Sequence, residues 1–177
     1  MELQFPLVAL LLLTAVTQIL PRQLLTYEDN SNGGYGTAIV GTISGTSISF
    51  GSEVVFESAD TRSISATYDT QNEKVVIAYE DDANSDYGNA VVGTVSGTSI
   101  SFGTPVVFEE ASVNNIAAVY DVNAQKIVII YKDVGNGSQG TVIEGTVSGT
   151  SISFGTAAVF EAGGATFNNA VYDPNEK

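Results

Sequence analysis

The chain of 177 residues contains no cysteine, no histidine and no tryptophan. Without cysteine it cannot form a disulfide, a thiolate nucleophile or a cysteine metal site. Without histidine it lacks the side chain that most often performs acid–base catalysis near neutral pH and most often binds zinc. Serine, cysteine and zinc hydrolases of the usual designs are therefore excluded, and the chain is expected to be a non-catalytic protein without a cofactor.

Positive charge is also scarce, because six basic residues stand against twenty acidic ones and give a net charge of −14. A field of this sign repels phosphate backbones and anionic membrane surfaces. Neither nucleic acid nor a membrane is therefore an expected partner. The acidic excess fits an extracellular location, or one on a cell surface or virion.

The residues that are abundant favour strands and tight turns. The chain has eighteen glycines, eight tyrosines and eight phenylalanines, together with many valines, isoleucines, threonines and serines. These types are typical of β-structure and its turns. We therefore predict an all-β fold.

An internal repeat organises the chain. The string SGTSISFG occurs at 44–51, 96–103 and 148–155, with a spacing of 52 residues each time. The repeat units span about 27–78, 79–130 and 131–177. Within one unit the pattern predicts four antiparallel strands, at 115–120, 126–131, 141–147 and 151–160.

The second strand of each unit is apolar on both faces, since Val75–Ala78 and Ile127–Ile130 are uninterrupted apolar runs. Burying each large side chain is worth roughly 1.5–3 kcal/mol, so both faces must be covered and the sheets must stack. The fourth strand alternates, with Ile100 and Phe102 on one side, and Gly103 is expected to mark a bulge.

This graded sheet predicts a partial β-propeller of three four-stranded blades over residues 21–177, with a β-trefoil as the alternative. The count begins with a strand at Arg22–Tyr27 and ends with one at Phe167–Tyr172. Three blades cannot close a ring, because propellers have about four to eight. Two copies could form a six-bladed homodimer; alternatively, the chain is a fragment of a longer array.

The unit resembles the blades of sialidase-type, Asp-box β-propellers, whose turn carries a Ser-x-Asp-x-Gly-x-Thr-Phe/Trp signature. The matching stretch, Ser96–Phe102, keeps the leading serine and the closing aromatic residue but lacks the Asp and the central glycine. The resemblance, which covers the chain from about Tyr27 onward, therefore implies blade geometry only. Arg22 and Arg62 are the only arginines and cannot supply the arginine triad of sialidases.

Residues 1–20 form an apolar leader, with the run Phe5–Leu20 as its core. The run is short for a membrane span and suits the core of a signal peptide, although no basic residue precedes it. A degraded repeat is the alternative.

One loop offers oxygen ligands at alternating positions, which is what calcium prefers. Asp82, Asn84 and Asp86 are the candidate metal ligands. A solvated turn is the alternative. A second acidic set, Asp69, Asp121 and Asp173, follows tyrosines at strand ends and is expected to cap turns by accepting backbone hydrogen bonds.

The loops that differ among the repeats are the expected ligand site, because loops carry function on a regular scaffold. They follow the second strand and the fourth strand, at the same end of each sheet. The candidate ligand-binding residues are Tyr35, Asp82, Asp86 and Tyr87. Drift in unconstrained loops would produce the same variation.

The sequence therefore predicts a non-catalytic repeat module for binding or surface display, either carbohydrate-binding or phage-fibre-like. A fragment of a glycoside-active propeller enzyme is the alternative, because an acidic chain has many carboxylates that could act in pairs.

Overall fold

The computed structural model describes residues 22–166 and 169–175, so the predicted leader at 1–20 lies outside the described residues. Within these ranges the regular structure consists of antiparallel strands and two single 3-10 turns, which confirms the all-β prediction. No helix in the described ranges has the length and apolar character needed to cross a membrane. The elements are β1 (Arg22–Asp29), η1 (Asn30–Asn32), β2 (Tyr35–Ser44), β3 (Ser47–Phe50), β4 (Val54–Asp69), β5 (Lys74–Asp81), η2 (Asp82–Asn84), β6 (Tyr87–Ser96), β7 (Ser99–Phe102), β8 (Val106–Asp121), β9 (Lys126–Asp133), β10 (Gln139–Ser148), β11 (Ser151–Phe154) and β12 (Ala158–Glu161).

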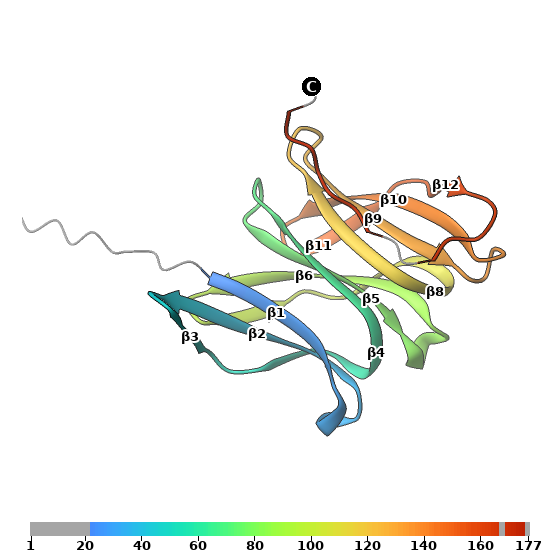
Figure 1. The fold of residues 1–177 in the computed structure, drawn as a ribbon. Coiled ribbons are helices and arrows are strands. Elements are labelled where there is room, and N and C mark those ends of the chain that lie inside the picture. Colours follow the sequence, from blue (N-terminus) through green and yellow to red (C-terminus); the bar gives the residue numbers. More distant parts are fainter. Residues whose placement is uncertain (1–21, 167–168, 176–177) are drawn as a thin grey trace, which may run out of the picture.

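The twelve strands form one connected antiparallel network with three sheets (Figure 1). The first sheet contains β1, β2, β3 and the start of β4. The second contains the end of β4, β5, β6, β7 and the start of β8, and the third contains the end of β8 and β9 to β12. The two sixteen-residue strands, β4 and β8, therefore each pass from one sheet into the next.

The predicted fourth strand is divided in two, which corrects the sequence interpretation. In the second sheet, β7 pairs with the end of β6, and the start of β8 pairs with the beginning of β6. Residues 103–105 separate the two pieces, and Gly103 donates its N–H to the Val92 carbonyl oxygen. The equivalent gaps in the other two sheets have the same feature, since Gly51 donates to Val40 and Gly155 to Glu144. The irregularity predicted at Gly103 is thus a break between two strands.

The predicted last strand, Phe167–Tyr172, is also corrected. Phe167 and Asn168 lie outside the described residues, and residues 169–173 are not in a strand. The equivalent segments of β4 and β8 form strands because β5 and β9 pair with them. Residues 169–173 have no such neighbour in the described part of the chain, and a single strand cannot satisfy its own backbone groups.

The two-faced second strand is confirmed by β5. Val75, Ile77 and Tyr79 belong to an apolar cluster shared with the first sheet, whereas Val76 and Ala78 belong to a cluster shared with the third sheet. All five side chains are buried. The second sheet is therefore covered on both faces, as its uninterrupted apolar run requires.

An aromatic contact joins the first sheet to the second. The Phe56 ring lies edge-on to Tyr79 and to Phe102, with centroid distances of 5.2 Å and 5.8 Å. The Tyr79 hydroxyl donates to the Glu57 carboxylate at 3.0 Å. Burial and the Glu57 charge raise the pKa of Tyr79 well above its ordinary value, so this phenol stays protonated and keeps its donor role.

The same contact recurs 52 residues later between the second and third sheets. Phe108 lies 5.2 Å from Tyr131 and 5.8 Å from Phe154, and the Tyr131 hydroxyl donates to Glu109 at 2.9 Å. The two interfaces are therefore built from equivalent residues in equivalent geometry. Each repeat unit therefore contains the residues that stack its sheet on the next one.

Glycine permits the backbones of neighbouring sheets to approach each other. A Cβ atom on Gly51 would overlap the Thr98 carbonyl oxygen of the next sheet, and one on Gly103 would overlap the Thr150 carbonyl oxygen. These threonines lie in the SGT hairpin turns, where Gly97 has the positive φ of 60° that a two-residue type II′ turn needs at its first position. The repeated string therefore contains both halves of a sheet-to-sheet contact.

Candidate ligand-binding face

The loops that differ among the repeats lie together at one end of the sheets. In each sheet a backbone hydrogen bond of 2.9–3.0 Å ties the loop after the second strand to the segment that follows the fourth. The three equivalent bonds run from Thr61 to Gly34, from Val113 to Asp86 and from Ala165 to Ser138, donor first. These loops therefore form one face, here called the loop face, as the meander predicts.

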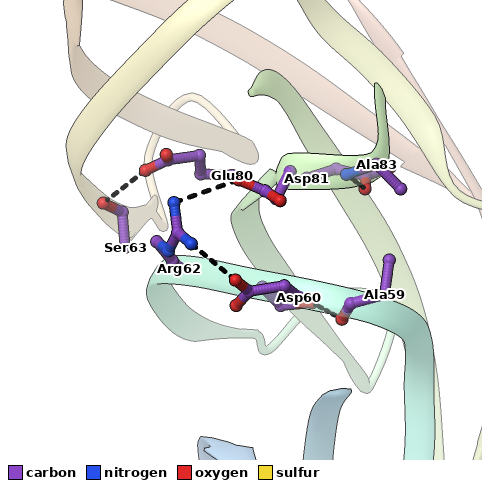
Figure 2. A network of polar contacts seen from close by, with 9 residues as sticks. Ala59, Asp60, Arg62, Ser63, Glu80, Asp81 and Ala83 are labelled. Carbon is purple, nitrogen blue, oxygen red and sulfur yellow. Dashed lines mark hydrogen bonds and ion pairs between the residues drawn. The ribbon is translucent and has the colours of Figure 1, made fainter. Parts of the chain in front are cut away.

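Arg62 is the centre of a charged network on the loop face (Figure 2). Its guanidinium group contacts Asp60 at 2.5 Å and Asp82 at 3.0 Å, so it joins β4 to the turn η2. The two carboxylates, Asp60 first, raise the pKa of Arg62. The Arg62 side chain is 49% exposed, which leaves part of it open to a ligand.

Glu80 lies next to this network and is 8% exposed. The Ser63 hydroxyl donates to its carboxylate at 3.1 Å and accepts a hydrogen bond from the Asn115 N–H at 3.2 Å. Burial, followed by the charges of Asp86 and Asp82, raises the pKa of Glu80 although the Ser63 hydrogen bond opposes the shift. Glu80 is therefore a buried carboxyl group with a raised pKa near the end of β5.

The structure brings the predicted ligand-binding residues to the loop face but does not join all of them. Tyr35 and Tyr87 are half-buried at the starts of β2 and β6, opposite Asp60 and Ser112. Asp82 is held by Arg62. Asp86 is half-buried, with a positive φ of 59°, and its carbonyl oxygen accepts the bond from Val113.

A chain of contacts runs along the loop face from Tyr35 to Asp82. Tyr35 lies opposite Asp60 in the sheet register, Asp60 binds Arg62, and Arg62 binds Asp82. The first and second sheets thus contribute to one connected patch.

Calcium binding by Asp82, Asn84 and Asp86 stays a prediction. Asp82 is engaged by Arg62, and Asn84 ends the 3-10 turn that Asp81 caps by accepting the Ala83 N–H at 3.1 Å. Over residues 22–166 and 169–175, no group of three or more His, Cys, Asp or Glu side chains is placed to hold a metal ion.

The turn-capping role expected of the second acidic set is confirmed at the opposite end of the sheets. Asp69 accepts the N–H groups of Gln71 and Asn72 at 2.9 Å and 3.0 Å, and Asp121 accepts those of Asn123 and Ala124 at 2.9 Å and 2.8 Å. Burial alone would raise the pKa of Asp69. Hydrogen bonds from Asn72 and neighbouring groups outweigh this effect and lower the pKa of the carboxyl group. These carboxylates organise hairpins.

Sequence reasoning missed Arg62, Glu80 and Ser63 as members of the face. A signal for Arg62 was present, since it is one of two arginines in a strongly acidic chain and lies in a variable segment. No comparable signal marks Ser63, whose positive φ of 50° turns β4 from one sheet into the next.

Comparison with protein-family models, with curated proteins and with solved structures finds no match for this chain.

Proposed function

We propose that the chain is a non-catalytic, propeller-type repeat module that binds a ligand, such as a carbohydrate, at the loop face and serves in surface display. The observation that carries the proposal is the contrast within one repeat. The SGTSISFG string is identical in all three units, whereas the loops around Tyr35, Arg62 and Asp82 differ and contain an exposed, charged network.

The chemistry of the face supports a polar, hydroxyl-rich ligand. Carboxylates accept and guanidinium groups donate hydrogen bonds, and tyrosine offers an apolar ring with a polar tip. Tyr35 and Tyr87 begin β2 and β6 of neighbouring sheets at the loop face, and each is half-buried. An extracellular or virion-surface location is part of the proposal, since such ligands occur there.

A glycan array probed with the full chain tests this function. We expect binding that falls at least about tenfold in Arg62→Gln and in Tyr87→Ala, because each removes a contact group from the face. Val122→Ser is the matched control, since Val122 is 49% exposed in a turn at the opposite end of the sheets. Absence of any bound glycan, or equal binding by all variants, would contradict the proposal.

One observation favours the second candidate, a glycoside-active enzyme. Glu80 is 8% exposed and its burial raises its pKa, as suits the acid of a glycosidase, and Asp82 and Asp86 in the loop that follows are the candidate second carboxylates. A panel of chromogenic glycosides separates the two functions. Turnover that disappears in Glu80→Gln would establish the enzyme, whereas glycan binding without turnover supports the module.

A further inference from the structure

The two outer sheets expose opposite halves of the contact that the structure shows twice in its interior. On the third sheet, Phe160 is equivalent to Phe56 and Phe108, which are each 7% exposed, yet Phe160 is 55% exposed. Its ring lies over Gly140 just as Phe108 lies over Gly88, so it occupies the same place without a covering sheet.

The first sheet exposes the complementary half. Ile48 is 45% exposed, whereas its equivalents Ile100 and Ile152 are 5% and 4% exposed. Phe50, equivalent to the interface residues Phe102 and Phe154, is 52% exposed. The face of the first sheet that carries Tyr27, Ile48 and Phe50 is here called the head, and the face of the third sheet that carries Gly155, Phe160 and Glu161 is called the tail.

We propose that the tail of one copy of this chain docks on the head of a second copy, through the contact that joins the sheets within a chain. Continuity with the two internal interfaces carries the proposal. Phe160 meets Tyr27 and Phe50 of the second copy, as Phe108 meets Tyr131 and Phe154. Gly155 receives the Thr46 carbonyl oxygen, as Gly103 receives that of Thr150.

The polar contact of the interface is also available at both ends. Glu161 is equivalent to Glu57 and Glu109, the acceptors of the buried tyrosine hydroxyls. Tyr27 is equivalent to Tyr79 and Tyr131, and in the single chain its hydroxyl donates to Glu53 at 2.6 Å. On docking, this hydroxyl transfers its hydrogen bond to Glu161 of the other copy.

A groove beside β1 provides the place for the segment that follows the tail. The groove has a volume of about 730 Å³ and is lined by Arg22 and Leu24 of β1, by Tyr68 of β4 and by Val75 of β5. Among the described residues β1 pairs on one edge only, with β2, and its other edge has unpaired backbone groups. Such an edge is a template for a further strand.

Residues 169–173 of the copy that supplies the tail match the β1 edge of the second copy in register and charge. In the second and third sheets the equivalent segments place Asp69 opposite Lys74 and Asp121 opposite Lys126. The same register places Asp173 of the tail copy opposite Arg22 of the second copy, again an acid opposite a base. Val171, which is 90% exposed in the single chain, then lies opposite Leu24.

Sedimentation velocity of the full chain over a range of concentrations tests the proposal. We expect concentration-dependent association that weakens at least about tenfold in Phe160→Asp and in Gly155→Ala. Gly155→Ala is the sharper probe, because within one chain its methyl group would meet only the flexible Glu144 side chain. Its unfolding midpoint, measured on the monomer, is expected to be unchanged, so lost association cannot reflect lost folding.

Val134→Asp is the matched control, because Val134 is 38% exposed on the same sheet but lies in the loop after β9. It should associate like the parent chain. A parent chain that stays monomeric at all concentrations overturns the proposal. So does association that Phe160→Asp and Gly155→Ala leave intact, since another surface would then be in use.

Mixing two variants tests the direction of docking. Phe50→Asp disables the head and Phe160→Asp disables the tail, so neither associates alone. An equimolar mixture retains one intact head and one intact tail and should form a complex of two chains, because a head-to-tail contact is heterologous. No complex in the mixture overturns the head-to-tail arrangement. The loop face takes no part in docking, so ligand binding by the monomeric Phe160→Asp variant tests the proposed function separately.

Discussion

At the scale of single residues, the closing glycine of SGTSISFG has a different surrounding in each repeat. On Gly51 and Gly103 an added methyl group would meet the backbone of the next sheet, which cannot move aside. On Gly155 it would meet only the Glu144 side chain, which can rotate away. Packing against the next sheet therefore requires glycine at Gly51 and Gly103 but not at Gly155 in the single chain.

Gly103→Ala is expected to destabilise the chain by about 1–3 kcal/mol, the usual cost of forcing extra volume into a packed contact. Urea unfolding followed by circular dichroism measures the change. Gly155→Ala is the control and should unfold at the parent midpoint when the protein is dilute enough to be monomeric. Equal midpoints for Gly103→Ala and the parent would show that the sheets are not in the close contact described.

At the scale of elements, β5 and β9 are equivalent strands with different cover. Every residue of β5 from Val75 to Glu80 is buried, whereas burial alternates along β9 because no sheet covers its outer face. Val76 is 0% exposed, and its equivalent Val128 is half-buried. A valine at this position therefore contributes more to the free energy of unfolding in β5 than in β9.

Val76→Ala is expected to cost about 2 kcal/mol, from the loss of two buried methyl-sized groups at about 0.8 kcal/mol each and a small cavity. Val128→Ala should cost less than half of this in the monomer, because the side chain is already partly in water. Chemical unfolding of both variants at low protein concentration gives the two values. Similar costs would mean that the outer face of β9 is covered in the single chain.

The all-β class, the 52-residue repeat and the two-faced second strand could be predicted because each follows from a local pattern. The continuity of β4 could not, because Ser63 turns the chain with a positive φ that no residue type at this position signals. The loop that contains Asp82 is enough to predict this residue as a ligand residue. Its partner Arg62 is twenty residues away, and the pairing of β4 with β5 that brings them together begins only where Ser63 turns β4 into the second sheet.

At the scale of the whole molecule, charge opposes folding and assembly. The net charge is −14, and the described residues contain three ion pairs, all with substantially exposed side chains, which involve Arg62 and Lys126. Exposed pairs of this kind contribute little, whereas repulsion among the remaining carboxylates acts over the whole surface at low ionic strength. Attraction between charges therefore stabilises the chain less than repulsion destabilises it.

Adding sodium chloride from about 0.01 M to 0.15 M shortens the screening length from about 30 Å to 8 Å, which removes most of the repulsion and little else. We expect the melting temperature to rise by a few degrees over this range. Head-to-tail association should strengthen in the same range, because two chains of like charge repel each other before their apolar faces meet. Melting followed by circular dichroism and sedimentation at each salt concentration measure both effects, with potassium chloride as the control for binding of a particular cation. A melting temperature that falls as salt is added would mean that attractive pairs, rather than repulsion, dominate the electrostatics of this acidic chain.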